Sequence, residues 1–149
     1  IAIETAETGH LVFGTLHTTT ATSTVDRIVD QFPADQQEQI RIMLSSSLKG
    51  VISQTLLKKI GGGRVAAHEI LLVNDAVGAM IREGKTHMML THMQTQKKLG
   101  NQTLNECLLQ LVKNKQITVE SAVLKCIDKT GMKELLKRNQ ITVPDASAA

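Results

Sequence analysis

The spacing of apolar residues changes character about halfway along the 149-residue chain. Ile1–Thr8 reads as the end of a helix, with Gly9 as its stop signal. The apolar run Leu11–Leu16 is bounded by Gly9 and by threonines, which is typical of a buried strand in a parallel sheet. Apolar residues over 25–32 then recur at helical spacing, and Pro33 ends that helix.

A long helix and a hairpin follow in the first half. Asp35 with Glu38 forms a capping-box pattern that predicts the start of the long helix. Gln54–Ile60 and Arg64–Val73 are strand-like, and the glycines Gly61–Gly63 between them indicate a hairpin.

Beyond Asn74 the pattern predicts short helices only. They are Ala76–Glu83, Thr86–Lys98, Leu104–Val112, Glu120–Ile127 and Met132–Arg138, the last three starting at Thr103, Thr118 and Thr130. We therefore expect an α/β domain over residues 1–74, a helical domain over 75–140, and a flexible tail over 141–149.

Composition narrows the class of partner. Apolar residues make up 42% of the chain and aromatic residues only 1%, so the core is aliphatic. Proteins that bind single-stranded nucleic acids stack bases on aromatic rings, so we expect no nucleic-acid partner. Residues 1–75 carry 6 basic and 8 acidic side chains (−2), whereas residues 76–149 carry 11 and 6 (+5). The basic half could face an anionic membrane or an acidic partner, or could simply be a solvated helical surface.

The cysteines and the hydropathy predict a cytoplasmic protein. Cys107 and Cys126 lie in helical patterns without metal-ligand spacing, so we expect reduced core thiols and no metal site. No apolar run approaches the length needed to cross a bilayer. The chain also opens without Met, inside a helix, so we expect that further residues precede it.

Two fragments imitate nucleotide-binding motifs. Gly78–Thr86 is close to a phosphate loop, but five residues instead of four separate Gly78 from Gly84, and the segment has helical spacing. Glu69–Asp75 imitates a magnesium-binding strand, but too few residues separate it from Gly78–Thr86 for a crossover, so we interpret it as hairpin strand.

The strongest candidate chemistry flanks Leu11–Leu16. Ligands of open α/β sheets bind beyond the carboxyl ends of strands, which is where His17 and Thr18 fall. A histidine there can donate to a phosphate oxygen, although a structural loop histidine is the alternative. His10 lies at the other, buried end of the same run.

The segment GHLVFGTLHT at Gly9–Thr18 resembles the histidine box of the secretion ATPase superfamily. The likeness continues through DRIVDQFPADQQEQIR and is most specific in QTLLKKIGGGRVAAHEI, where it is to type IV pilus retraction ATPases. This resemblance implies the C-terminal portion of a RecA-like ATPase core, a small helical domain after it, and a homo-hexamer with ATP between subunits.

The resemblance also suggests roles for individual residues. It implies that His17 is catalytic, that His10 and Thr18 lie near the phosphates, and that Arg27 reaches a nucleotide across a subunit boundary. The residues alone instead favour a solvent-facing Arg27 paired with Asp26 or Asp30.

The segment AVGAMIRE resembles the family's retraction-linked helix, AIRNLIRE. The matching residues are Ala76, Ile81, Arg82 and Glu83. Gly78 and Ala79 replace an arginine and an asparagine, which suggests a charge lost from an exposed helix face and a helix weakened by glycine.

The resulting hypothesis is part of an ATP-driven motor for type IV pilus retraction and twitching motility. The complete protein would use ATP and Mg²⁺ and act with an inner-membrane platform protein, peripheral to the membrane and without a transmembrane segment. No phosphate loop occurs in these residues, so the fragment alone is expected to be inactive. A pilus-assembly or type II secretion ATPase is an alternative, although the latter usually has a four-cysteine zinc insertion; a non-enzymatic adaptor is another.

Overall fold

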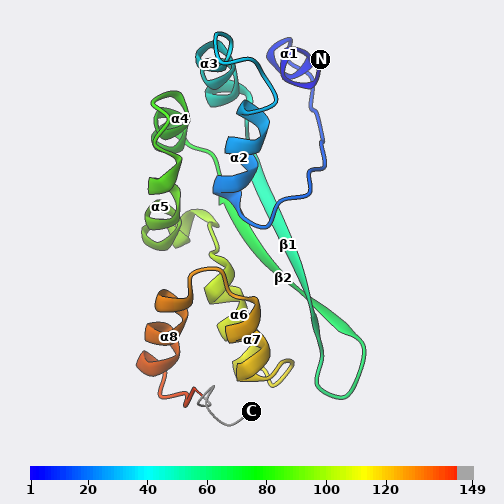
Figure 1. Cartoon of the computed structure of the whole chain (residues 1–149), viewed down its shortest axis with the longest axis vertical. Coiled ribbons are helices and arrows are strands. Elements are labelled where there is room, and N and C mark those ends of the chain that lie inside the picture. The colour runs from blue at the N-terminus through cyan, green and yellow to red at the C-terminus, as the bar shows by residue number, and fades with distance from the viewer. Residues whose placement is uncertain (144–149) are drawn as a thin grey trace. The chain divides into compact units, whose positions relative to one another are not determined.

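The computed structural model describes residues 1–143 and divides into two compact units. The first unit comprises Ile1–Ser53 and Ile70–Asn101, and the second comprises Gln54–Glu69 with the described residues from Gln102 onward (Figure 1). The predicted α/β mixture of helices and strands is confirmed. The expected boundary at residue 74 falls inside the first unit, because residues 70–101 pack with the residues before the hairpin.

The helices of the first unit surround an aliphatic core. They are α1 (Ala2–Glu7), α2 (Ala21–Val29), α3 (Gln37–Ser47), α4 (Asp75–Arg82), α5 (Met89–Thr95) and the 3₁₀ turns η1 (Thr86–Met88) and η2 (Lys97–Leu99). One face of α2 supplies Ala21, Val25 and Val29, which are fully buried at i, i+4 and i+8. They share a core with Leu71 of the hairpin, with Val77 and Ile81 of α4, and with Met89 and Met93 of α5.

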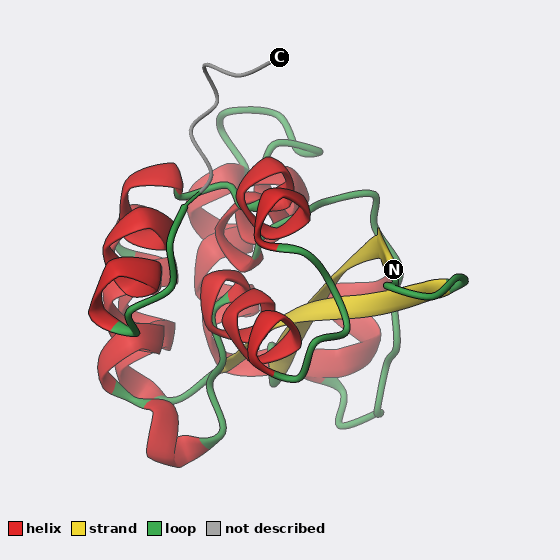
Figure 2. Cartoon of the chain, turned by 90° about the horizontal axis from the view of Figure 1, so that it is seen from below, coloured by secondary structure: helices red, strands yellow, loops and turns green. Residues whose placement is uncertain are grey.

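Strands β1 (Gly50–Lys58) and β2 (Arg64–Leu72) form the only sheet among the described residues, seen as the twisted ribbon in Figure 2. The Lys59 N–H donates to the Gly63 carbonyl at 3.1 Å, and the Val73 N–H donates to the Lys49 carbonyl at 3.0 Å. Both bonds give one unbroken antiparallel register, in which residue numbers of opposed pairs add to the same value. Even-numbered side chains therefore share one face and odd-numbered side chains the other.

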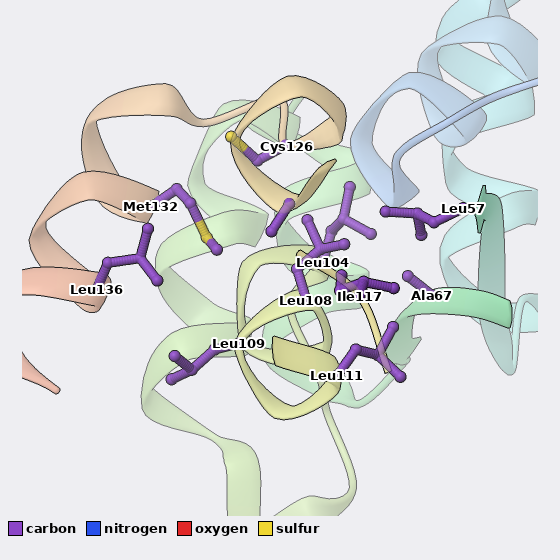
Figure 3. Close-up of a cluster of buried hydrophobic side chains, with 11 residues drawn as sticks. Leu57, Ala67, Leu104, Leu108, Leu109, Leu111, Ile117, Cys126, Met132 and Leu136 are labelled. Atoms are coloured by element: carbon purple, nitrogen blue, oxygen red, sulfur yellow. The ribbon is translucent and has the colours of Figure 1, made fainter. Parts of the chain in front are cut away.

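The second unit encloses its own core between the end of the hairpin and three helices. These are α6 (Leu104–Lys113), α7 (Val119–Lys125) and α8 (Lys129–Arg138). The predicted helix start at Thr103 is confirmed, and it is a capping box: the Glu106 N–H donates to the Thr103 hydroxyl at 3.3 Å, and the Thr103 N–H donates to the Glu106 carboxylate at 3.3 Å. Figure 3 shows the buried cluster, in which Leu57 and Ala67 of the hairpin join the leucines of α6.

Both cysteines of the second unit are free, as predicted. Cys126 is a buried member of the core, and burial raises the pKa of its thiol although the neighbouring Lys129 ammonium opposes the shift. Cys107 packs against the same core. Both cysteines therefore pack as small core side chains, each with one weak hydrogen bond: Cys107 Sγ accepts from the His68 N–H at 3.4 Å, and the Cys126 thiol donates to the Val123 carbonyl at 3.1 Å.

The predicted strand at Leu11–Leu16 is wrong as local secondary structure. Residues 10–18 have no regular structure and connect α1 to α2 as an extended loop in Figure 1. Phe13 is 89% exposed and Leu11 is 78% exposed. The sequence has strand character, but backbone N–H and C=O groups pair only with a neighbouring strand, and the described residues place none beside this segment.

Several predicted helix ends are also wrong. α2 ends at Val29, so Phe32 lies outside it. α3 begins after Gln36 without a side-chain cap, because residues 34–36 form a turn and Asp35 lies within it. The last helix is capped by Asp128, whose carboxylate accepts from the Gly131 N–H at 2.9 Å, and not by Thr130.

The expected tail also begins later than predicted. Ile141 and Val143 pack against the core of the second unit, and the Ile141 N–H donates to the Leu136 carbonyl at 3.0 Å. The remainder of the predicted tail, 144–149, lies outside the described residues. Among the described helices, none has both the length and the apolar character to cross a membrane.

We predict that Leu108→Ala lowers the free energy of unfolding of the second unit by about 3 kcal/mol, because truncating a fully buried leucine leaves a cavity. Leu124→Ala is the matched control, since Leu124 is exposed on α7, and should change stability by less than about 0.5 kcal/mol. Urea unfolding followed by circular dichroism measures both, since the chain has no Trp or Tyr fluorophore. Equal effects of the two changes would contradict the assignment of this core.

Candidate functional site

The segment that enters α2 is organised by hydroxyl groups. The Thr20 hydroxyl accepts from the Ser23 N–H at 3.0 Å, and the Ser23 hydroxyl accepts from the Thr20 N–H at 3.2 Å. This reciprocal cap fixes where the helix begins. The Thr24 hydroxyl donates to the Thr20 carbonyl at 2.7 Å and lies 2.6 Å from the hydroxyl of Thr18. Thr18 is therefore held at the start of α2 by a side-chain contact.

The two histidines of the predicted site both lie on the extended loop. His17 is exposed directly before the anchored Thr18. His10 was expected at a buried strand end, but it is exposed, and its Nδ1 lies 3.1 Å from the Thr8 hydroxyl at the end of α1. His10 is exposed because the loop that carries it has no sheet neighbour in the described part of the chain. Both imidazole rings are open to solvent.

Arg27 projects from the last turn of α2, where a cation is favoured by the helix dipole. Its side chain is exposed, and in residues 1–143 it forms no ion pair with Asp26 or Asp30. Asp26 instead accepts a hydrogen bond from the Thr86 hydroxyl of η1 at 2.9 Å. The pairing favoured by the residues alone is therefore wrong. No hydrogen bond or ion pair in residues 1–143 joins Arg27 to His17 or Thr18 either.

The predicted retraction-linked helix is α4, capped by Asn74, whose side chain accepts from the Val77 N–H at 3.0 Å. Its matching residues divide by exposure: Ile81 is buried in the core, whereas Ala76, Arg82 and Glu83 are exposed. The Lys85 ammonium, 2.7 Å from the Glu83 carboxylate, holds the pKa of that carboxyl below its usual range.

Gly78 corrects the expectation of a charge missing from an exposed helix face. This residue is buried, and a Cβ placed on it would lie 3.0 Å from the Ser45 carbonyl oxygen of α3. The glycine lets the backbones of α3 and α4 approach closely, which offsets its helix-propensity cost of about 1 kcal/mol. The same residues confirm that the imitation phosphate loop is helical from Gly78 to Arg82.

A cleft of about 390 Å³ opens beside this contact in the first unit. Ser45, Ser46 and Lys49 line it from the end of α3, and Asp75, Gly78 and Arg82 line it from α4. The Arg82 guanidinium donates to the Ser45 hydroxyl at 3.4 Å, and the Lys49 ammonium donates to the Ser46 carbonyl at 3.4 Å. Two cations thus border the cleft and are restrained only by long hydrogen bonds.

Sequence reasoning missed the serines of this cleft. Ser45 and Ser46 follow no motif, and only the fold brings Ser45 to Arg82 and brings the Ser46 hydroxyl within 3.0 Å of Glu7 in α1. The buried Gly78 was the one usable signal, since a glycine inside a helix often marks a close approach. No group of three or more His, Cys, Asp or Glu side chains suited to a metal ion occurs in residues 1–143.

Comparison with known proteins gives this geometry a context. Residues 1–62 match the family described as Type II/IV secretion system protein. The type IV pilus retractation ATPase PilT of Pseudomonas aeruginosa is 57% identical over 122 residues, covering 82% of this chain and 36% of that protein. The twitching motility protein of Neisseria gonorrhoeae is 54% identical over 123 residues, with 82% and 33% covered. A crystal structure of the pilus retraction motor PilT with bound ADP superimposes with a TM-score of 0.80 at 50% identity, covering 89% of this chain and 37% of that one.

The fold and the matched residues place the chain in the secretion ATPase family. Within that family it belongs with the pilus retraction ATPases, as the level of identity over four-fifths of the chain shows. The chain spans about a third of the length of the curated relatives that it matches.

We predict that Gly78→Leu lowers the free energy of unfolding of the first unit by about 2 kcal/mol, because the side chain would be forced against the Ser45 carbonyl. Ala76→Leu on the same helix is the control and should change stability by less than about 0.5 kcal/mol, because Ala76 is exposed. Denaturant unfolding compares the two variants. A Gly78→Leu protein as stable as the parent would show that the two helices can separate at no cost.

Proposed function

We propose that this chain is part of an ATP-driven motor that powers retraction of type IV pili. The observation that carries the proposal is the 57% identity to a protein named as a pilus retraction ATPase. The structural likeness to a retraction motor supports it independently, because the described elements follow that motor at a TM-score of 0.80.

In the complete protein, His17, Thr18 and Arg27 would line one wall of a nucleotide site, with His10 close by. The imidazole of His17 can donate to a phosphate oxygen, and the anchored Thr18 limits how far His17 can move. The guanidinium of Arg27 has the charge and planar geometry to stabilise a transferring phosphoryl group, and no carboxylate in residues 1–143 neutralises it. The N–H groups of the imidazole and of the guanidinium are therefore hydrogen-bond donors that suit phosphate oxygens.

The rest of a nucleotide site would come from elsewhere in the complete protein. Residues 1–143 contain no cluster of three or more acidic, histidine or cysteine side chains that could hold Mg²⁺. The cleft described above is lined by α3, α4 and the residues next to them, and not by His17, Thr18 or Arg27. ATP with Mg²⁺ is therefore proposed for the complete protein only. We further propose that Leu11–Leu16 becomes a sheet strand there, since its exposed apolar side chains would then gain cover.

Helix α4 is the proposed output element of the motor. It is rigidly seated, because Ile81 is buried and Gly78 lies against α3, yet Arg82 and Glu83 remain exposed. A rigid helix with exposed charges can transmit movement to another protein. The proposed partners are further copies of the same chain in a hexamer and an inner-membrane platform protein, with a cytoplasmic location.

The alternatives were an assembly or type II secretion ATPase and a non-enzymatic adaptor. The identity to retraction proteins favours the motor over the first alternative. An adaptor would have no need for an exposed arginine without an ion pair or for exposed histidines, and measurements of ATP hydrolysis distinguish the two possibilities.

We predict that Arg27→Ala in the full-length protein lowers the rate of ATP hydrolysis by on the order of 10³-fold, as expected for an arginine that stabilises phosphoryl transfer. His17→Ala should lower it by on the order of 10²-fold through loss of one phosphate donor. His87→Ala and Lys98→Ala are the controls, since both side chains are exposed outside the proposed site. Unchanged hydrolysis in the Arg27 and His17 variants would support the adaptor.

We predict that Arg82→Ala in the full-length protein leaves ATP hydrolysis within about twofold of the parent but abolishes pilus retraction, because the change removes a charge from the exposed face of a helix whose core contacts stay intact. Hydrolysis and twitching motility are measured on the same variant. Lys98→Ala again serves as the control. Normal twitching by the Arg82 variant would rule out a role of this side chain in output.

A further inference from the structure

The loop of the β1–β2 hairpin concentrates positive charge. Lys58, Lys59 and Arg64 flank Gly61–Gly63, and all three cationic side chains are exposed. In residues 1–143, no hydrogen bond or ion pair engages these three cationic side chains. The charge at this end of the hairpin is therefore uncompensated.

The strand register makes this arrangement unfavourable for the isolated hairpin. The bond from the Lys59 N–H to the Gly63 carbonyl places Lys58 directly opposite Arg64 on one face of the ribbon. The pair does not exchange backbone hydrogen bonds, so its side chains are especially close. Like charges directly opposite each other destabilise a sheet. An anion placed between or above them would relieve that repulsion.

The glycines at the end of the loop are open to approach. Gly61, Gly62 and Gly63 all have positive φ angles, of 85°, 107° and 77°, and a Cβ on any of them would meet nothing within 4 Å. The backbone amides can thus be approached closely, and nothing walls the loop into a pocket. Ile60 stands among the cations and is 51% exposed, which adds an apolar group at the tip.

A backbone hydrogen bond within the second unit holds the loop of the hairpin in place. The Ile60 N–H donates to the Gln116 carbonyl at 2.8 Å, in the turn that follows α6. Lys113 and Lys115 of the same region are also exposed. Both lie within three residues of Gln116 in sequence, so they add exposed positive charge to the segment that contacts Ile60.

We propose that this tip, formed by residues 58–64, binds the anionic surface of a phospholipid membrane directly. Cations around an exposed isoleucine suit lipid headgroups, because phosphates meet the charges while the apolar side chain enters the boundary with the acyl chains. Nucleic acid fits less well, because the tip has no aromatic side chain on which a base could stack. An acidic protein segment would be expected in a groove, whereas nothing lies within 4 Å of the positions that Cβ atoms would take on Gly61, Gly62 and Gly63. The inference does not depend on the motor function.

The test is sedimentation of the full-length protein with vesicles of phosphatidylcholine alone and of phosphatidylcholine mixed with phosphatidylglycerol. We expect binding only to the anionic vesicles, weakened by added salt. Each cation beside an anionic membrane contributes about fivefold to partitioning, so K58A/K59A/R64A should bind on the order of 100-fold less. The Ile60→Ser variant should bind anionic vesicles about 5-fold less than the parent.

The matched control is K133A/K137A/R138A, which removes three exposed cations from α8 of the same unit and should change binding by no more than about twofold. Equal loss in the control, or retained binding in K58A/K59A/R64A, would overturn the proposal. So would absence of binding to anionic vesicles, or a preference for poly-glutamate over vesicles. Far-UV circular dichroism verifies folding, and ATP hydrolysis without vesicles should be unchanged in the tip variants, which separates this outcome from failure of the motor assignment.

Discussion

The register of the β1–β2 hairpin decides which side chains reach the two cores. Odd-numbered residues face inward along both strands: Val51 and Leu71 enter the core of the first unit, and Leu57 and Ala67 enter the core of the second. A slip of one residue would turn every side chain to the opposite face and expose these four. Both cores therefore depend on the same backbone ladder, and the cross-strand contact of Gln54 with His68 at 3.0 Å helps to fix it on the other face.

The contact of α3 with α4 is a second constraint, and it connects packing with the proposed output of the motor. Because Gly78 has no side chain, α4 lies against the Ser45 carbonyl, and Ile81 reaches the core on the same helix. The polar ends of the two helices then border a cleft in which Arg82 is restrained by one long hydrogen bond. Gly78 departs from the family sequence and suggested a weakened helix, but its lack of a side chain is what lets α4 pack against α3 in this chain.

Local signals in the sequence predicted the elements whose stabilising partners are local. The predicted helix start at Thr103 was confirmed, because Thr103 and Glu106 cap each other across three residues. The predicted hairpin was also confirmed, with Gly61–Gly63 in the left-handed angles of its loop. Leu11–Leu16 failed as a strand because strand formation needs a distant neighbour. Asp35 failed as a cap because a turn precedes α3. The approach of Ser45 to α4 could not be predicted from the serine itself, since serines at a helix end have no preferred partner; only Gly78 indicated a close approach to this helix.

The state of Arg27 is the point at which fold and proposed chemistry meet. Two aspartates flank it in sequence, and a pairing with either would have screened the charge that phosphoryl transfer requires. The fold prevents one of these pairings by directing Asp26 to the hydroxyl of Thr86, 60 positions away in sequence, at 2.9 Å. That hydrogen bond is partly buried, so it holds the carboxylate more firmly than an exposed ion pair would. The guanidinium, which stays protonated in any case, is thereby kept from that pairing and remains accessible, which is the condition that the proposed phosphate site would impose on it.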